Sequence, residues 1–431
     1  MNYFLQIWHS KDLRKKILFT LLIITITRIL GQVSLPQANL EALRVIFQQN
    51  QLLGMFSLLT GGNADNFSVI LMGLSPYINA SIIIQLLTVI IPKLENLSKE
   101  GEQGRRTLNQ YTRYLTIPIA FLQSYGMIML LNSQSPIPII TNIQAPNVIL
   151  PIMLTVTAGS LLLMWLGELI TEKGIGNGVS LLIFAGIIAN IPAVLGQSMA
   201  LAQQSNEKLI PLVVMILATL ALTILVILIT EAQRQIPVIY SGHGMRGKTS
   251  NSNLPIRINQ AGMIPIIFAV SLVSFPNLLA TFFAKSPNTT LQAVASWLAS
   301  NFHQNSPLYM IFYFLLIIAF TFFYVSITFN PDQVAENLQK RGGYIPGIRP
   351  GKQTSEYLGN VSNRLNLYGG LFIALIAISP IFLGNVFTSL NLGSVPTLIS
   401  GAGLIIIAGV VLELLRQINA QLVMHDYNKL Y

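Results

Sequence analysis

Residues Leu209–Thr230 read LIPLVVMILATLALTILVILIT, an uninterrupted run that contains no charged side chain. An α-helix needs about 20 mainly apolar residues to cross the hydrocarbon core of a bilayer, which is about 30 Å thick. In lipid, the backbone polar groups of such a run are satisfied only if the run is helical or part of a closed barrel. This stretch therefore predicts a membrane-spanning helix and an integral membrane protein.

Reading outward from this stretch predicts ten membrane spans in all. Only 9% of the 431 residues are charged and 52% are hydrophobic, whereas soluble domains carry about 25% charged residues. The predicted spans are Ile17–Leu35, Ser68–Ile91, Tyr114–Leu131, Val148–Ile170, Val179–Gly196, Leu209–Thr230, Ala261–Phe283, Pro307–Phe329, Leu367–Thr388 and Thr397–Leu415.

The positive charges set the predicted orientation. An even number of spans puts both termini on one side, and Met1–Ser10 lacks the form of a cleavable signal, so the first span is expected to be retained. A cytoplasmic N-terminus places 21 of the 25 Lys and Arg residues inside, as the positive-inside rule requires. The exceptions are Arg28, Arg44, Lys208 and Lys285. The net charge of +10 is spread over several membrane-bounded loops, which does not favour nucleic-acid binding.

The acidic residues and the histidines exclude several chemistries. Glu168, Glu231 and Glu413 lie near the cytoplasmic ends of predicted spans, and no acidic residue lies at mid-span. Ion-coupled carriers keep ionisable groups near the bilayer centre because coupling requires them. The chain has no cysteine, and its four histidines lack metal-ligand spacing. We therefore expect no enzymatic activity, no cofactor and no metal. Arg28 is the one charge within a span, and we expect it to snorkel or pack between helices.

Several segments resemble the SecY family of protein-conducting channels, from the first span to the tenth. The resemblance implies an all-α membrane protein in which two inverted five-helix halves, residues 1–200 and 205–431, surround a central hourglass-shaped pore. An odd number of spans in each half agrees with an inverted repeat. The segments that carry the resemblance are GLSPYINASIIIQLL (73–87), KEGEQGRR (99–106), QYTRY (110–114), GIGNG (174–178), FAGI (184–187), NQAGMIP (259–265), Asn330-Pro331 through Asn337-Leu338, and PGIRPG (346–351).

The resemblance implies a narrow ring of aliphatic side chains in the pore. Pairs spaced by four residues share one helix face, and aliphatic side chains form a constriction that can gate by dewetting. An isoleucine on a membrane helix more often faces lipid or packs in a core, so the family match alone singles these residues out. The ring positions are Leu74, Ile78, Ile183, Ile187, Ile264, Ile267 and Ile406.

The resemblance also implies a plug and a lateral gate. The segment before the second span, residues 53–67, matches the plug that closes the pore from outside; an interfacial outer loop is the alternative. The second and seventh spans match the gate through which signal sequences and transmembrane segments leave for lipid; ordinary polar contacts within a bundle are the alternative there. The plug residues are Ser57, Thr60, Gly61 and Gly62, and the gate residues are Asn79, Gln123, Asn259 and Phe275.

Two long cytoplasmic loops, residues 231–260 and 330–366, are rich in Gly, Pro and basic residues and predict acidic or anionic partners. The resemblance names these partners as the ribosome or the SecA motor, which would supply the energy. It also implies small SecE-type and SecG-type membrane subunits. The candidate contact residues are Arg234, Arg246, Lys248, Arg257 and Arg349.

Two other functions remain open from the residues alone: a secondary transporter for a small solute, and a scaffold that receives helices but opens no pore. The leading interpretation is a passive channel for unfolded polypeptides. The richness in Ile, Asn and Gln favours a plastid thylakoid membrane, and a bacterial inner membrane is the alternative.

Overall fold

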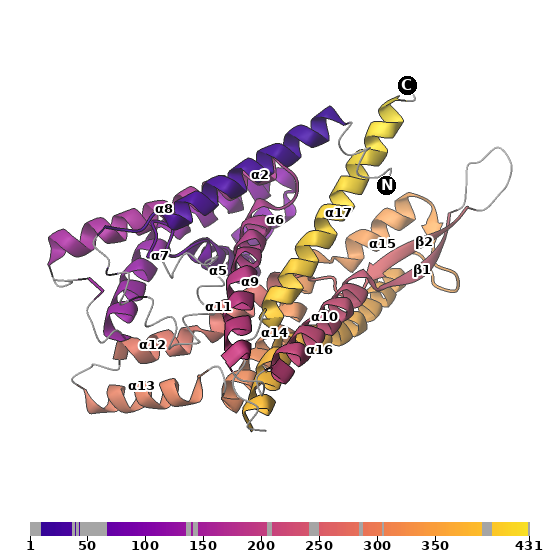
Figure 1. The fold of residues 1–431 in the computed structure, drawn as a ribbon. Helices are drawn as coiled ribbons and strands as arrows, with labels where there is room; N and C mark the ends of the chain where they lie inside the picture. Colours follow the sequence, from indigo (N-terminus) through magenta and orange to yellow (C-terminus); the bar gives the residue numbers. More distant parts are fainter. Residues whose placement is uncertain are drawn as a thin grey trace. The chain divides into compact units, whose positions relative to one another are not determined.

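The computed structural model describes residues 10–36, 39, 43, 67–134, 139–140, 145–204, 209–240, 250–283, 288–303, 306–389 and 399–429. Helices dominate these residues, as predicted (Figure 1). In chain order they are α2 (Lys11–Gln32), α5 (Ser75–Ile90), α6 (Pro92–Lys99), α7 (Glu102–Gln134), α8 (Pro146–Lys173), α9 (Gly178–Gln204), α10 (Leu209–Glu231), α11 (Ile264–Val273), α12 (Phe275–Phe283), α13 (Thr289–Asn301), α14 (Pro307–Thr328), α15 (Pro331–Lys340), α16 (Lys352–Ser389) and α17 (Gly401–Lys429).

The predicted spans can be followed one by one in these helices. Within the described residues, seven helices are long and apolar enough to cross a bilayer, and there are eight if α5 and α6, which are bent by 102° at their junction, are counted as one span. The remaining two predicted spans are α2 and the pair α11–α12. α2 is not among the seven helices because three charged residues, Lys15, Lys16 and Arg28, lie in every 18-residue stretch of it. A stretch of that length with three charges is less apolar than the seven others.

The chain forms two compact units. Unit 1 contains Met1–Leu212, Ser274–Tyr309 and Val410–Tyr431, and unit 2 contains Val213–Val273 and Met310–Gly409. These units do not test the predicted halves at residues 1–200 and 205–431, which stay a prediction. In unit 1, α7 packs against α5 and α8, and α8 packs against α2 and α9.

The segment before α5 is not helical as predicted from Ser68. Residues 67–74 form successive turns, and the helix begins only at Ser75. The backbone N–H of Leu35 donates to the Phe67 carbonyl at 3.0 Å, and that of Val69 donates to the Val33 carbonyl at 3.0 Å. A Cβ on Gly159 of α8 would stand 2.1 Å from the Val69 carbonyl oxygen. The turns are therefore held between the end of α2 and a glycine of α8.

The predicted seventh span, Ala261–Phe283, is broken at Ser274. Its first part, α11, belongs to unit 2, and seven of its ten residues are buried. Its second part, α12, belongs to unit 1 and packs against α7 and α13. Pro276 lies in the first turn of α12, where its missing N–H would have had no helical partner.

The two long loops of unit 2 fold together into one small domain, although the sequence suggested only loops. Residues 233–240 form β1, residues 250–257 form β2, and residues 343–344 form β3, in the antiparallel order β2-β1-β3. Figure 1 shows the β1–β2 hairpin beyond the end of α10. The hairpin, α15 and the first turns of α16 share an apolar core of Ile236, Val238, Ile256, Leu338, Ile345 and Leu358.

The GIGNG motif is the turn between α8 and α9. Gly176 has a φ of +84°, which favours glycine. The Asn177 side chain accepts a hydrogen bond from the Ser180 N–H at 3.2 Å, which caps the first turn of α9. The Thr171 hydroxyl accepts from the Gly178 N–H at 2.8 Å and donates to the Gly167 carbonyl at 3.0 Å. The turn thereby fixes where α9 starts against α8.

Replacing Gly178 by Ala should destabilise the protein by about 1–3 kcal/mol. A Cβ at this position would lie 1.9 Å from the Gly167 carbonyl oxygen, so the backbone of α8 or α9 must move. Gly196→Ala on the same helix is the matched control, because nothing lies within 4 Å of its Cβ position. It should be neutral or stabilising by up to about 1 kcal/mol. Thermal unfolding in detergent measures both, and equal melting temperatures would contradict the packing at Gly178.

Candidate channel site

Unit 1 contains both predicted aliphatic pairs. Leu74 and Ile78 lie at the start of α5, where the Ile78 N–H donates to the Leu74 carbonyl at 3.0 Å, so the two side chains share one face of the first turn. Ile183 and Ile187 lie one turn apart on α9. All four side chains are buried, which agrees with an apolar constriction and also with an ordinary helix core.

Unit 2 carries the other three predicted ring residues. Ile267 on α11 and Ile406 on α17 are buried, whereas Ile264 at the first position of α11 is partly exposed. The closed ring of seven residues stays a prediction, because its members are divided between the two units.

The predicted gate residues occupy different settings. Asn79 on α5 is partly exposed, and α5 packs directly against α7, which carries Gln123. The Gln123 carbonyl oxygen is buried and has no hydrogen-bond partner among the described residues. Asn259 accepts a hydrogen bond from the Gly262 N–H at 2.8 Å and so shapes the turn ahead of α11. Phe275 begins α12 and is largely exposed.

Arg28 contacts the helix that carries one aliphatic pair. Its guanidinium donates a hydrogen bond to the Ala185 carbonyl of α9, between Ile183 and Ile187. The helix-packing role expected for this residue is thus present. Among the described residues, no Asp, Glu, Lys, Arg or His side chain is fully buried, and no three His, Asp or Glu residues group as metal ligands would.

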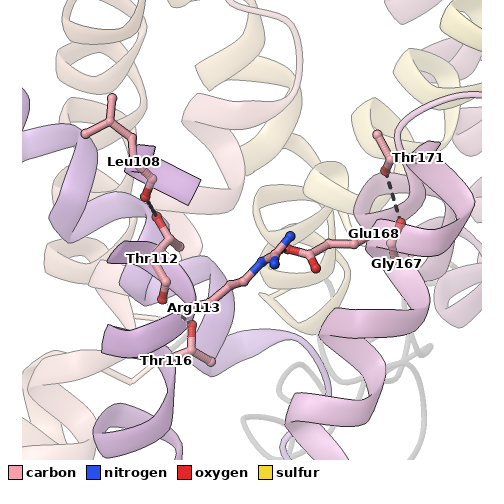
Figure 2. A network of polar contacts seen from close by, with 7 residues as sticks. All are labelled: Leu108, Thr112, Arg113, Thr116, Gly167, Glu168 and Thr171. Atoms are coloured by element: carbon pink, nitrogen blue, oxygen red, sulfur yellow. Dashed lines mark hydrogen bonds and ion pairs between the residues drawn. The ribbon is translucent and has the colours of Figure 1, made fainter. Parts of the chain in front are cut away.

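A polar network joins α7 to α8 (Figure 2). Arg113 Nε lies 2.7 Å from Glu168 Oε1. Around the pair, the hydroxyls of Thr112, Thr116 and Thr171 donate to carbonyls of their own helices. None of these three hydroxyls donates across from α7 to α8 or back, so the ion pair is the cross-link that Figure 2 shows between the two helices.

The small domain of unit 2 carries the three predicted contact arginines that lie within the described residues. Arg234 and Arg257 lie on β1 and β2 and are exposed. Arg349 is also exposed, between Gly347 (φ +80°) and Gly351 (φ +97°). Its own carbonyl accepts a hydrogen bond from the buried Thr354 hydroxyl at 2.9 Å. This hydrogen bond holds the backbone at Arg349, and the Arg349 side chain is exposed to solvent.

Other predicted site residues lie outside the described residues. They are the four plug residues Ser57, Thr60, Gly61 and Gly62, and the two basic residues Arg246 and Lys248.

Comparison with known proteins decides the family. The family model described as SecY matches residues 68–415. The chain belongs to the SecY family. It is 43% identical over 434 residues to the protein translocase subunit SecY of Halalkalibacterium halodurans, covering 98% of this chain and 97% of that one. It is 40% identical over 428 residues to the same subunit of Bacillus licheniformis, covering 97% and 96%. Both organisms are bacteria, so these relatives give no support to the thylakoid preference.

Solved SecY-type structures share the fold. A protein-conducting channel matches with a TM-score of 0.67 at 18% identity, covering 94% of this chain and 92% of that one. Sec61 in the canine ribosome-channel complex from the endoplasmic reticulum matches with a TM-score of 0.63 at 19% identity, over 94% and 92%. The all-α membrane fold predicted from the sequence is therefore confirmed.

Sequence reasoning missed the contacts that position this SecY chain's site. Glu168 stood out only as a charge near a span end, because its partner Arg113 is 55 residues away along the chain. Thr20 of α2, which accepts a hydrogen bond from the Ile175 N–H at 3.2 Å, carried no signal either. Threonine in a membrane helix is common, and only the packed structure shows which neighbour it meets.

Breaking the Arg113–Glu168 pair should cost about 0.5–1 kcal/mol, because Arg113 is 48% and Glu168 23% exposed and water screens the attraction. A double-mutant cycle with Arg113→Gln and Glu168→Gln measures the coupling as unfolding free energies in detergent. The control is the Arg106–Glu102 pair, 77% and 82% exposed on one helix, whose coupling should be smaller. Equal couplings would show that the α7–α8 pair is not a specific cross-link.

Proposed function

We propose that this chain is the pore subunit of a protein translocase, which moves unfolded polypeptides across a membrane and releases apolar segments sideways into lipid. The match to curated SecY translocase subunits along almost the whole chain carries this proposal. The site agrees in its chemistry, because buried aliphatic pairs on α5 and α9 offer an extended chain no fixed hydrogen bonds and offer an ion no ligand.

The pore is passive in this proposal and makes no covalent bond. Coupled carriers need ionisable groups in the membrane interior, and no described carboxylate is fully buried. This argues against the secondary transporter. Energy for the movement then comes from partners: a SecA-type motor with ATP, or a translating ribosome. The canine Sec61 structure is a ribosome-channel complex, which supports the ribosome as one partner, and SecE-type and SecG-type subunits complete the proposed complex.

The plug and the gate are assigned by resemblance. A SecY structure that matches this chain with a TM-score of 0.65 at 18% identity, over 94% of this chain and 92% of that one, is described as having a plug domain that stabilises the closed state and maintains a membrane seal. Residues 53–67 precede the second predicted span in the sequence and are proposed for the same task here. The lateral gate is proposed between the second span, with Asn79, and the seventh, with Phe275.

Both termini are proposed to face the cytoplasm, because that orientation puts 21 of the 25 Lys and Arg residues inside. The membrane is proposed to be a bacterial inner membrane, in keeping with the bacterial relatives. The small domain with Arg349 then faces the compartment in which proteins are made.

Replacing Ile78 and Ile187 together by Ser should make the membrane leak ions. Hydroxyls in the constriction favour water, so the dewetted barrier is lost. The measurement is ion flux through vesicles that contain the purified complex.

Ile83→Ser with Ile188→Ser is the matched control for the leak. These residues lie on the same two helices, at 39% and 40% exposure, and should face lipid instead of the pore. A leak confined to the ring variant supports a channel. Tight vesicles with both variants would favour the scaffold that opens no pore.

Arg349→Glu should weaken binding of a ribosome or a SecA-type motor by about tenfold and slow precursor translocation accordingly. The estimate assumes the loss of one hydrogen bond from a charged group, worth about 1.5 kcal/mol. Arg341→Glu, an exposed arginine after α15 in the same domain, is the control and should change binding little. Sedimentation with each partner at two salt concentrations measures both. Unchanged binding by the Arg349 variant would remove this residue from the interface.

A further inference from the structure

Helix α13 lies outside the predicted spans, and its sequence suggests a specific environment. It runs from Thr289 to Asn301 and contains no charged residue. Asn288 caps it by accepting hydrogen bonds from the Thr290 N–H at 3.1 Å and from the Thr290 hydroxyl at 2.6 Å. The cap makes α13 a helix with a defined start, distinct from α12.

The two sides of α13 differ in chemistry. Leu291, Val294 and Trp297 follow one another at three-residue spacing on one side, and they are 39%, 55% and 55% exposed. Polar side chains lie on the opposite side of the helix: Gln292, Ser296 and Ser300, all exposed. Ala295 is buried, and α13 packs against α12. The packing with α12 therefore leaves a continuous apolar stripe uncovered.

The connections of α13 to the predicted spans before and after it place the helix at one surface of the membrane. α12 ends the predicted seventh span at Phe283, and α14 begins the eighth at Pro307. Consecutive spans meet the same surface at their joined ends, so both ends of α13 are held within a few residues of one surface. A helix of this length covers about 20 Å at 1.5 Å per residue, which suits a helix lying along the surface.

We propose that the apolar stripe of α13, formed by Leu291, Val294 and Trp297, docks in the lipid interface of the bilayer. Tryptophan is enriched at the boundary between headgroups and acyl chains, and an amphipathic helix buries its apolar side to about that depth. Phe275 and Phe283 of α12, the helix against which α13 packs, are also exposed.

The docked helix holds the far end of the seventh span. α13 packs against α12, and α12 packs against α7. With α13 seated in the interface, this packing holds α12 close to that surface. This anchoring applies to a membrane protein of this fold whatever it transports, so it does not rest on the proposed translocase activity.

The absence of cysteine makes the test direct. Single cysteines at Leu291, Val294 and Trp297, and at Gln292, Ser296 and Ser300, each receive a spin label in the full chain reconstituted with its partner subunits. The vesicles contain phosphatidylcholine and phosphatidylglycerol. Collision rates with oxygen, which concentrates in lipid, and with a water-soluble nickel chelate are then compared. Leu220→Cys on α10, 57% exposed, gives the lipid reference, and Lys340→Cys on α15 gives the water reference.

The proposal expects an oxygen-to-nickel collision ratio several-fold higher on the apolar side than on the polar side, with a period of one helical turn. Nickel collision rates equal to those at Lys340 on both sides would overturn it, because α13 would then stand in water. Low rates with both reagents on the apolar side would also overturn it, since a protein surface would cover the stripe. Dipolar broadening between labels would then identify a second copy. Each side has three positions, so one variant that fails to fold leaves the comparison intact.

Discussion

Backbone contact at glycine is the interaction on which the arrangement of these helices depends. Helices in lipid gain little from hiding apolar surface, so their association relies on close packing and on satisfied polar groups. Every helix that carries a predicted ring residue begins beside such a contact, where a Cβ would approach a carbonyl oxygen to 2.5 Å or less. The contacts are Gly159 with Val69 ahead of α5, Gly178 with Gly167 at α9, Gly369 with Ile258 ahead of α11, and Gly401 with Ile376 at α17. Because no side chain fits between the backbones, each contact holds the chain close to a neighbouring segment, at the start of the helix or a few residues ahead of it.

Two contacts of charged groups in unit 1 also join helices. Arg28 meets a backbone carbonyl of α9, and Arg113 meets Glu168 on the neighbouring helix. A charged group near lipid is tolerated when it has a partner or reaches water. These charges serve to hold helices together and leave the buried interior aliphatic. This separation of roles is what distinguishes a passive passage from a carrier, in which the charges themselves must move or bind the substrate.

In unit 2, the basic surface and the helix α11 are parts of one folded body. The β1–β2 hairpin continues into α11 through Ile258, whose N–H donates to the Ala232 carbonyl at 3.0 Å, and through Gln260, which accepts a hydrogen bond from the Ser362 hydroxyl at 3.0 Å. The domain that carries Arg349, the residue proposed for partner binding, is therefore hydrogen-bonded to the segment directly ahead of α11. The shared core of the hairpin, α15 and α16 gives this domain its rigidity.

The sequence by itself determined that the chain spans a membrane many times, because the length of an apolar run and the placement of Lys and Arg are properties of single segments. It also named the family, through motifs that lie close together along the chain. It did not show that the helix of the second span starts only at Ser75, that the seventh span breaks at Ser274, or that residues 231–260 and 330–366 share a sheet. The first and the last of these features depend on partners far apart in sequence: Gly159 with Val69 for the start of the second span, and Ile239 with Tyr344 for the sheet. Only the tertiary structure decides them, because the energy of such a contact exists only once both backbones are in place.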